Sequence, residues 1–266
     1  MNELKNYGLK IDDKDENAYV LGGGMLSKII LQPDGNWERY LPQYEPQFNA
    51  QYDSYGCTVW SIENVVETML KKIEGIEYNF SERFIYILAN IVPPGADPHY
   101  VMEVCRERGL IADALLPMTP SYEWFLTPKP MTENLLEEGL KFKYEVKHEY
   151  LWSWRDSPTK EERLAKIREA LQYSPIAVSV TAWIEENGVY VDNGQPNTHL
   201  TMLYAIGEKG YMIFDSYDSS IKVLSFDHNI QIAKRFHLEK SNKLQQVSLL
   251  QKIISKLKQL IEKYAS

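Results

Sequence analysis

The chain has 266 residues, of which 44% are hydrophobic and 25% charged, and its formal net charge at pH 7 is −8. This composition is that of an ordinary globular protein, long enough to bury one good-sized core. The acidic balance argues against binding to nucleic acid, which requires a basic face, and no apolar run is long enough to span a membrane.

The cysteines and the N-terminus bear on the cellular compartment. Two cysteines, Cys57 and Cys105, cannot form a disulfide framework, and one of them can be given a chemical role. The first residues, Met-Asn-Glu-Leu-Lys-Asn, lead into a polar stretch that lacks the apolar core of a signal peptide. We therefore expect a cytoplasmic protein, or a virion-associated one if a phage encodes it.

The chain divides into three parts. Residues 1–44 are polar and contain three consecutive glycines, 22–24, and the turn-like run 33–35. They predict an extended lead-in with a few edge strands. Residues 45–240 carry the main domain, and residues 241–266 form a separate amphipathic tail.

The first helix of the main domain is expected to run from Cys57 to about Lys72. Gly56 precedes it, no proline interrupts it, and apolar side chains recur at helical spacing. Two acidic residues in this run, Glu63 and Glu67, are interpreted as part of a solvated helix face.

Three further helices are expected. Ser81 is a plausible N-cap for the second, and the third begins after Pro98 and ends at Gly109. The fourth has Thr159 as N-cap and Glu162 three residues later, which is the spacing of a capping box.

The second half of the main domain changes to the period of strands. Residues 175–182, 200–206 and 211–215 are each apolar runs without a helical pattern, and a Gly-Glu-Lys-Gly turn separates the last two. Helices first and antiparallel strands second predict an α+β domain.

The tail, residues 241–266, has apolar residues alternately three and four positions apart, the seam of a parallel coiled coil. The seam is shorter than three heptads, and extra apolar residues widen it, so packing on the chain's own domain is equally consistent. Five lysines and one glutamate also make the tail basic, which suits a membrane surface or an acidic partner. We rank homo-oligomerisation or partner docking first.

Three short segments predict a cysteine nucleophile with its base and orienter. Cys57 would open a helix, whose partial positive charge favours the thiolate. His199 lies 142 positions later and Asp215 a further 16. A thiol needs a base within hydrogen-bond reach and a third group that holds the base in one orientation. Cys105, in the middle of a helix, is interpreted as a buried core residue.

Metal and cofactor sites are not expected. The remaining histidines are interpreted as structural, and no pair among the five has a metal-ligand spacing. The three glycines at 22–24 lack the strand and helix that flank a phosphate-binding loop.

These segments resemble the papain-like cysteine peptidases, in compact forms such as phages and bacteria encode. The similarity covers roughly residues 45–220 and includes Ser81-Glu-Arg-Phe-Ile-Tyr-Ile-Leu and Gly188-Val-Tyr190 as well as the three segments above. The resemblance implies a helical first half, an antiparallel second half, and an active-site cleft between them. It also implies that a glutamine before Cys57 completes the oxyanion hole.

Two glutamines compete for that role. Gln51 is six residues before Cys57, which matches the family's spacing, whereas Gln47 fits if the loop carries an insertion. Some compact members resemble the Glu-x-Gln pattern of residues 45–47. Both glutamines stay open at this point, because either amide could join the Cys57 N–H in holding an oxyanion.

The residue at 215 departs from the family, which usually has asparagine. Aspartate can also accept the histidine proton, but it changes the charge balance of the site. The resemblance implies a peptidase that cleaves protein or peptide substrates. The alternatives are a papain-like amidase or acyl transferase, or a catalytically inactive binding or assembly module, because fold does not fix function.

Overall fold

The computed structural model describes residues 6–10, 29–153, 155–217 and 221–240. Its helices are η1 (Glu38–Tyr40), α1 (Cys57–Glu74), α2 (Glu82–Leu88), α3 (Pro98–Arg108), η2 (Asp113–Leu115), α4 (Tyr122–Phe125), α5 (Glu133–Leu140) and α6 (Lys160–Ala170). Its strands are β1 (Tyr144–Trp152), β2 (Ile176–Val180), β3 (Glu185–Glu186), β4 (Val189–Tyr190), β5 (His199–Ile206), β6 (Tyr211–Phe214), β7 (Ile221–Leu224) and β8 (Ala233–Lys240).

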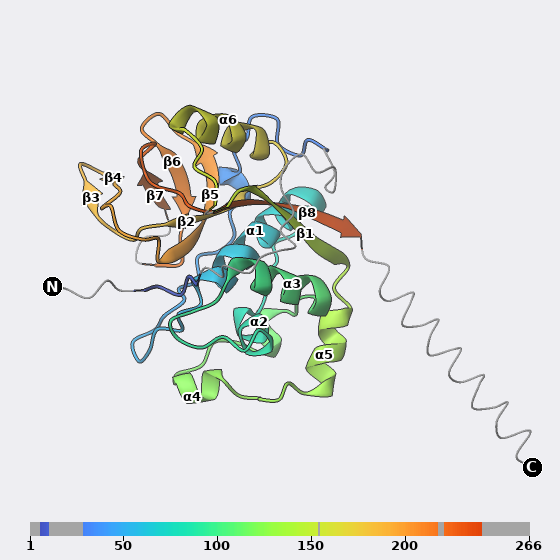
Figure 1. Cartoon of the computed structure of the whole chain (residues 1–266). Helices are drawn as coiled ribbons and strands as arrows, with labels where there is room; N and C mark the ends of the chain where they lie inside the picture. Colours follow the sequence, from blue (N-terminus) through green and yellow to red (C-terminus); the bar gives the residue numbers. More distant parts are fainter. Residues whose placement is uncertain (1–5, 11–28, 154, 218–220, 241–266) are drawn as a thin grey trace, which may run out of the picture.

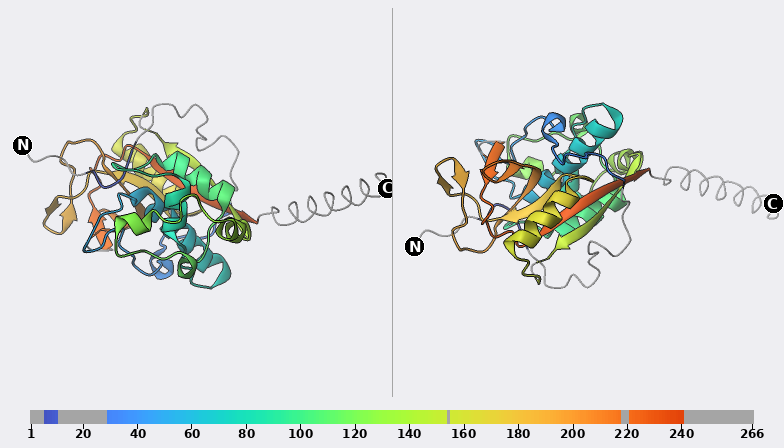
Figure 2. Two further views of the ribbon diagram at one scale, coloured as in Figure 1. Left: turned by 90° about the horizontal axis from the view of Figure 1, so that it is seen from below. Right: turned by 90° about the horizontal axis from the view of Figure 1, so that it is seen from above.

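The strands form one sheet in the order β1-β8-β2-β5-β6-β7-β4-β3. All pairs are antiparallel except β4 and β7, which pair in parallel. Figure 1 shows helices α1 to α5 on one side of this sheet and α6 on the other. The views of Figure 2 show α6 lying along the opposite face, so the sheet is covered on both sides. The predicted α+β class, with helices first and antiparallel strands second, is confirmed.

Helix α1 is the central element, because it packs against β5, β2 and β8 as well as against α2 and α3. The predicted helix is confirmed, and it ends two residues later than expected, at Glu74. Gly75 follows with φ 67°, a left-handed conformation that suits glycine at a helix C-terminus. A helix surrounded in this way is buried on most of its circumference.

The interpretation of two acidic side chains of α1 is wrong. Glu63 is 1% exposed and Glu67 7% exposed, so neither lies on a solvated face. Glu67 Oε1 accepts a hydrogen bond of 2.7 Å from the Phe80 N–H. Burial raises the pKa of both carboxyl groups well above the ordinary value, which favours their neutral form.

The other predicted helices are confirmed, with their caps. Ser81 Oγ accepts from the Phe84 N–H at 3.2 Å at the start of α2. Thr159 and Glu162 form the expected capping box of α6. Helix α3 begins at Pro98 with Asp97 as its cap and is followed by Gly109.

Strand β1 carries charged and polar side chains into the interior. His148 is 3% exposed, and its Nε2 lies 3.1 Å from Glu103 Oε1 on α3. Its Nδ1 lies 3.2 Å from Nζ of Lys234 on β8. Burial, and after it the charge of Lys234, lower the pKa of His148 to about 3. The ring is therefore neutral in the folded protein at neutral pH.

Acidification is expected to weaken the fold through His148. Below pH 6.5 the unfolded chain protonates this ring, whereas the folded chain does not until about pH 3. The stabilisation is thus complete above pH 6.5 and is lost as the pH falls towards 3, by about 2 kcal/mol at pH 5. Urea unfolding at pH 7 and pH 5 should show this loss in the wild type and a smaller one in His148→Gln. Equal losses in the two proteins would contradict it.

Part of the lead-in packs against the main domain. Trp37 in the lead-in is fully buried, and its Nε1–H donates to the Leu171 carbonyl at 2.7 Å. The predicted tail, residues 241–266, lies outside the described residues. The boundaries 1–44, 45–240 and 241–266 therefore stay predictions. Among the described helices, none has the length and hydropathy needed to cross a bilayer.

Candidate active site

Cys57 is the first residue of α1, and its sulfur lies against the start of β5. Gly56 at the N-cap offers no side chain to the free N–H groups of the first turn. The side chain of Cys57 is fully buried, and the Leu200 N–H donates to its Sγ at 3.4 Å. The sulfur is thus next to the backbone of the residue that follows His199.

His199 and Asp215 meet across the β5–β6 pair. His199 opens β5, and Asp215 comes directly after β6, whose Phe214 pairs with Met202. The His199 Nε2 lies 2.5 Å from Asp215 Oδ1, and both side chains are fully buried. The other ring nitrogen, Nδ1, is buried and has no hydrogen-bond partner in the described parts of the chain. One nitrogen is therefore held by a carboxylate while the other remains available.

Lys222 completes this group, and the sequence analysis missed it. It lies on β7 opposite Ile213 of β6, and its Nζ is 2.7 Å from Asp215 Oδ2. Lys222 occupies the same alternating face as the buried Leu224, but a charged residue at such a position weakens the apolar alternation by which a strand is predicted from sequence. A lysine at an inward-facing strand position requires a partner.

The ionisation of these groups is set by burial and by their neighbours. Burial would raise the pKa of Asp215, but His199 and Lys222 outweigh it through charge and hydrogen bonds, and the pKa is lowered. Burial raises the pKa of the Cys57 thiol, and the charge of Asp215 adds to this, while the Leu200 N–H opposes it. In this closed arrangement the thiol is favoured over the thiolate.

The structure brings Gln47 into the site and leaves Gln51 at the surface. Gln47 is fully buried, and its Oε1 accepts from Ser216 Oγ at 2.9 Å. This bond directs its Nε2 towards the Tyr7 carbonyl, to which it donates at 2.9 Å. The side chain of Gln51 is exposed to solvent.

Residues 6–10 cover Cys57 and His199. The Tyr7 N–H donates to the Thr198 carbonyl at 3.0 Å, and the Gly8 carbonyl accepts from the Ala96 N–H at 2.9 Å. Figure 1 shows this dark-blue segment between the strands and the helices. A Cβ on Gly8 would lie 2.1 Å from the Tyr55 carbonyl oxygen and 3.1 Å from the Cys57 nitrogen. The segment is therefore in close backbone contact with the start of α1.

Three aromatic rings meet the His199 imidazole edge to face. Their centroids lie 5.4 Å (Tyr7), 5.5 Å (Trp183) and 6.1 Å (Tyr217) from that of His199. Tyr217 also donates its hydroxyl to Asp53. These rings keep water away from the imidazole, which strengthens its hydrogen bond to Asp215.

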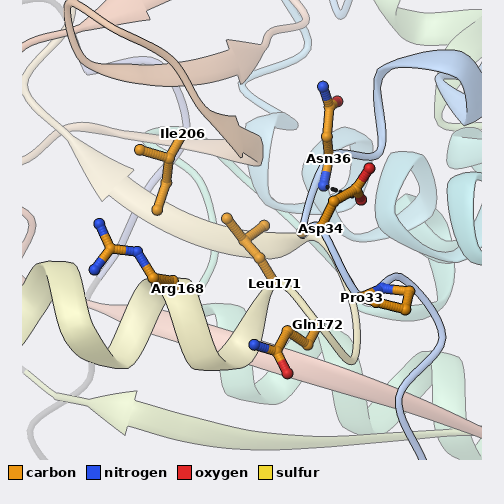
Figure 3. A pocket seen from close by; sticks show the side chains of 8 residues that line it. Pro33, Asp34, Asn36, Arg168, Leu171, Gln172 and Ile206 are labelled. Atoms are coloured by element: carbon orange, nitrogen blue, oxygen red, sulfur yellow. Dashed lines mark hydrogen bonds between the residues drawn. The ribbon is translucent and has the colours of Figure 1, made fainter.

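A separate hollow of about 380 Å³ lies at the other end of β5, between the loop that carries Asp34 and the end of α6 (Figure 3). Ile206 lines it, and roughly 23 Å of strand separate this residue from His199. Asp34 is engaged within its own loop by the Asn36 N–H at 3.0 Å. The hollow is thus remote from Cys57 and His199, and it is not part of the candidate active site.

Several solved structures share the fold of this chain. The cysteine protease and lectin-like domains of Cwp84 from Clostridium difficile match with a TM-score of 0.55 at 13% identity, over 70% of this chain and 48% of that chain. Bromelain from Ananas comosus, in complex with the E64 inhibitor, matches with a TM-score of 0.55 at 14% identity, over 77% of this chain and 98% of that chain. The fold is papain-like.

Procathepsin L 3 from the Tenebrio molitor larval midgut has the papain-like fold as well, with a TM-score of 0.54 at 11% identity over 88% of this chain and 76% of that chain. No family model and no curated protein sequence matches the chain. The chain spans about half the length of the Cwp84 chain. At these identities the similarity establishes the papain-like fold alone.

Proposed function

We propose that the chain is a cysteine peptidase. The Cys57 sulfur attacks the carbonyl carbon of a peptide bond, and His199 takes the thiol proton at Nδ1. The protonated His199 then gives this proton to the leaving amine as the C–N bond breaks. Water attacks the resulting thioester, with His199 as base, and releases the acid and the free thiol. Asp215 holds the imidazole in the required orientation throughout.

The observation that carries this proposal is the arrangement of the three side chains. Asp215 Oδ1 is 2.5 Å from Nε2 of His199, which leaves the buried Nδ1 without a hydrogen-bond partner among the described residues. The Cys57 sulfur is 3.4 Å from the nitrogen of the residue next to this histidine. The side chains proposed as nucleophile, base and orienter are thus neighbours in one buried site.

Gln47 is our choice for the oxyanion donor, because its Nε2–H already donates to a peptide carbonyl, that of Tyr7, at 2.9 Å. The second donor is the Cys57 N–H at the start of α1, where helix geometry leaves the first N–H groups free. Gln51 has no comparable contact with the site, since its side chain is exposed.

A polypeptide is the substrate class that the contacts of residues 6–10 support. The carbonyl of Thr198 and both main-chain groups of Ala96 form hydrogen bonds of 2.9–3.4 Å with this segment. Such pairing with an extended main chain depends little on side-chain identity. An amidase or acyl transferase would use the same nucleophile, and hydrolysis of peptides separates these activities.

A second candidate is a catalytically inactive papain-fold module. Cys57 is fully buried, and burial raises the pKa of its thiol, which is the state expected of an unreactive cysteine. In the peptidase, the same burial results from residues 6–10, which have to leave the site before a substrate enters.

Labelling by an epoxide inhibitor of thiol proteases distinguishes the two candidates. The full chain is treated from pH 4 to 9, as wild type and as His199→Ala, and the modified cysteine is mapped by mass spectrometry. The buried Cys105 is an internal reference. The peptidase predicts stoichiometric modification of Cys57 that falls at least about 100-fold in His199→Ala. Equal, slow labelling of both cysteines in both proteins, also when each carries Gly8→Val to displace residues 6–10, would support the inactive module.

A further inference from the structure

A buried lysine lies inside the candidate site. Lys222 is 2% exposed, and its ammonium group is 2.7 Å from Asp215 Oδ2 and within hydrogen-bond distance of the Tyr217 carbonyl. It also lies over the rings of Trp183 and Tyr190, at 5.1 and 5.8 Å from their centroids. The ammonium group thus has a carboxylate, a carbonyl and two aromatic faces as neighbours.

An apolar side chain would also suit the inward-facing position of Lys222 on β7. Its β7 neighbour on the same face, Leu224, fills the core with an apolar side chain. Burying an ammonium group has a high desolvation cost, which is offset here by the equally buried carboxylate of Asp215. Lys222 and Asp215 therefore form one buried ion-paired unit.

The net charge of the site depends on Lys222. A thiolate on Cys57 and an imidazolium on His199 cancel each other, which leaves the charge of Asp215. With Lys222 the sum over these four groups is zero. Without it the site is negative, and the thiolate would form against an uncompensated carboxylate, whose charge already opposes the ionisation of Cys57.

We propose that Lys222 is a positioning residue that fixes the second oxygen of Asp215 and compensates its charge, so that His199 meets a carboxylate whose charge is balanced. This inference rests on the proposed roles of Cys57, His199 and Asp215. The Asp215–Lys222 pair then does what an asparagine does at the corresponding position of the family that the sequence resembles. Aspartate becomes compatible with the thiolate because its charge is cancelled.

Several other ionisable groups face this unit. They come from the elements packed around it and are Cys57 and His199, Asp53, which hydrogen-bonds Tyr217, and the tyrosines 7, 190 and 217. Asp53 adds a second negative influence on the Cys57 thiol, and it is unchanged in every variant below.

The test is the pH dependence of Cys57 alkylation by iodoacetamide in full-length Lys222→Met. Methionine has a similar length and no charge. We expect the midpoint of the alkylation profile to move up by about one pH unit, so that the rate at pH 7 falls about tenfold. All variants retain residues 6–10, so access to the site is the same in each comparison.

The double variant Asp215→Asn/Lys222→Met separates charge compensation from packing. It removes both charges, and we expect its midpoint to return to within about 0.3 unit of the wild type. Lys234→Met, which removes a lysine that is also buried but lies on β8, should leave the midpoint in place. If Lys222→Met lowers only the folded fraction and the midpoint of the folded protein stays unchanged, Lys222 has a structural role alone and the inference fails.

An NMR titration of the Asp215 carboxyl carbon tests the proposed role of Lys222 without relying on the reactivity of Cys57. The signal is assigned by its absence in Asp215→Asn. Lys222 is one of the groups that lower the pKa of this carboxyl, so Lys222→Met should raise it by about one unit or more. A Cys57 that stays unreactive even in Gly8→Val would reject the peptidase while this titration still tests Lys222. An unchanged Asp215 titration would overturn the inference about Lys222.

Discussion

Gly8→Val should accelerate the labelling of Cys57 about fivefold or more and raise peptide hydrolysis in parallel. Gly8 has a φ of 119°, which a β-branched residue adopts only under strain, and its Cβ would lie 2.1 Å from the Tyr55 carbonyl oxygen. Strain of about 1–3 kcal/mol corresponds to a factor of roughly 5 to 150 in the population of the displaced segment.

The segment should leave the site because few bonds hold it. Its main chain makes hydrogen bonds of 2.9–3.4 Å with Thr198 and Ala96, each worth about 1 kcal/mol net. The bonds among His199, Asp215 and Lys222 do not involve residues 6–10. Displacement of the segment therefore leaves the proposed catalytic group in place.

A matched control and a second variant make this prediction specific. Gly188 also has a positive φ, 78°, but no atom lies within 4 Å of the position that a Cβ would take there, so Gly188→Val should leave labelling unchanged. A chain that begins at residue 11 should behave like Gly8→Val. Wild-type labelling rates in both the truncated chain and Gly8→Val would show that residues 6–10 do not control access.

Gln47→Ala should lower kcat about 100- to 1,000-fold, with little change in KM. The variant removes the Nε2–H that contacts the Tyr7 carbonyl at 2.9 Å, and the loss of one oxyanion donor has an effect of this size. The measurement is steady-state hydrolysis of a peptide substrate in the Gly8→Val background, where the site is open.

Gln51→Ala is the matched control, because it removes the same amide from an exposed position six residues before Cys57. Its kcat should stay within about twofold of the parent. Unfolding of Gln47→Ala has to be measured as well, since Gln47 also binds Ser216 at 2.9 Å. A large loss of kcat in Gln51→Ala and none in Gln47→Ala would reverse the assignment.

The local elements were predictable because their signals are local. The apolar spacing after Cys57 predicts α1, and the pair Thr159 and Glu162 predicts the capping box of α6. The order of Cys57, His199 and Asp215 suggested one site, and the β5–β6 register explains why the last two meet. The predictions of α1 and of the capping box need only spacing along the chain.

Strands β1 and β8 were missed for a physical reason. They form the longest pair in the sheet, yet both carry charged residues at buried positions, such as the Glu149–Arg235 ion pair. Strand prediction relies on alternating apolar residues, and buried ion pairs remove that alternation. The same reason hides Lys222, whose partner Asp215 becomes visible only when β6 and β7 are paired.

Two further features depend on contacts between segments that are distant in the sequence. They are the burial of Glu63 and Glu67 and the contacts of Tyr7. Helix α1 shows an apolar stripe, but its polar face is covered by other helices and loops, which a single helix cannot reveal. Tyr7 lies 191 positions from Thr198 in the sequence and 3.0 Å from it in space. Nothing in the polar lead-in indicates where it binds.

The covering segment belongs to the same polypeptide as the site, and this has a kinetic consequence. An inhibitor in cis has an effective concentration that does not change when the protein is diluted. Latency would therefore persist at any protein concentration, and a substrate would have to compete with a ligand that never diffuses away. Closure would raise the apparent KM and leave kcat at saturation unchanged, so that abundant peptide alone is enough to open the site.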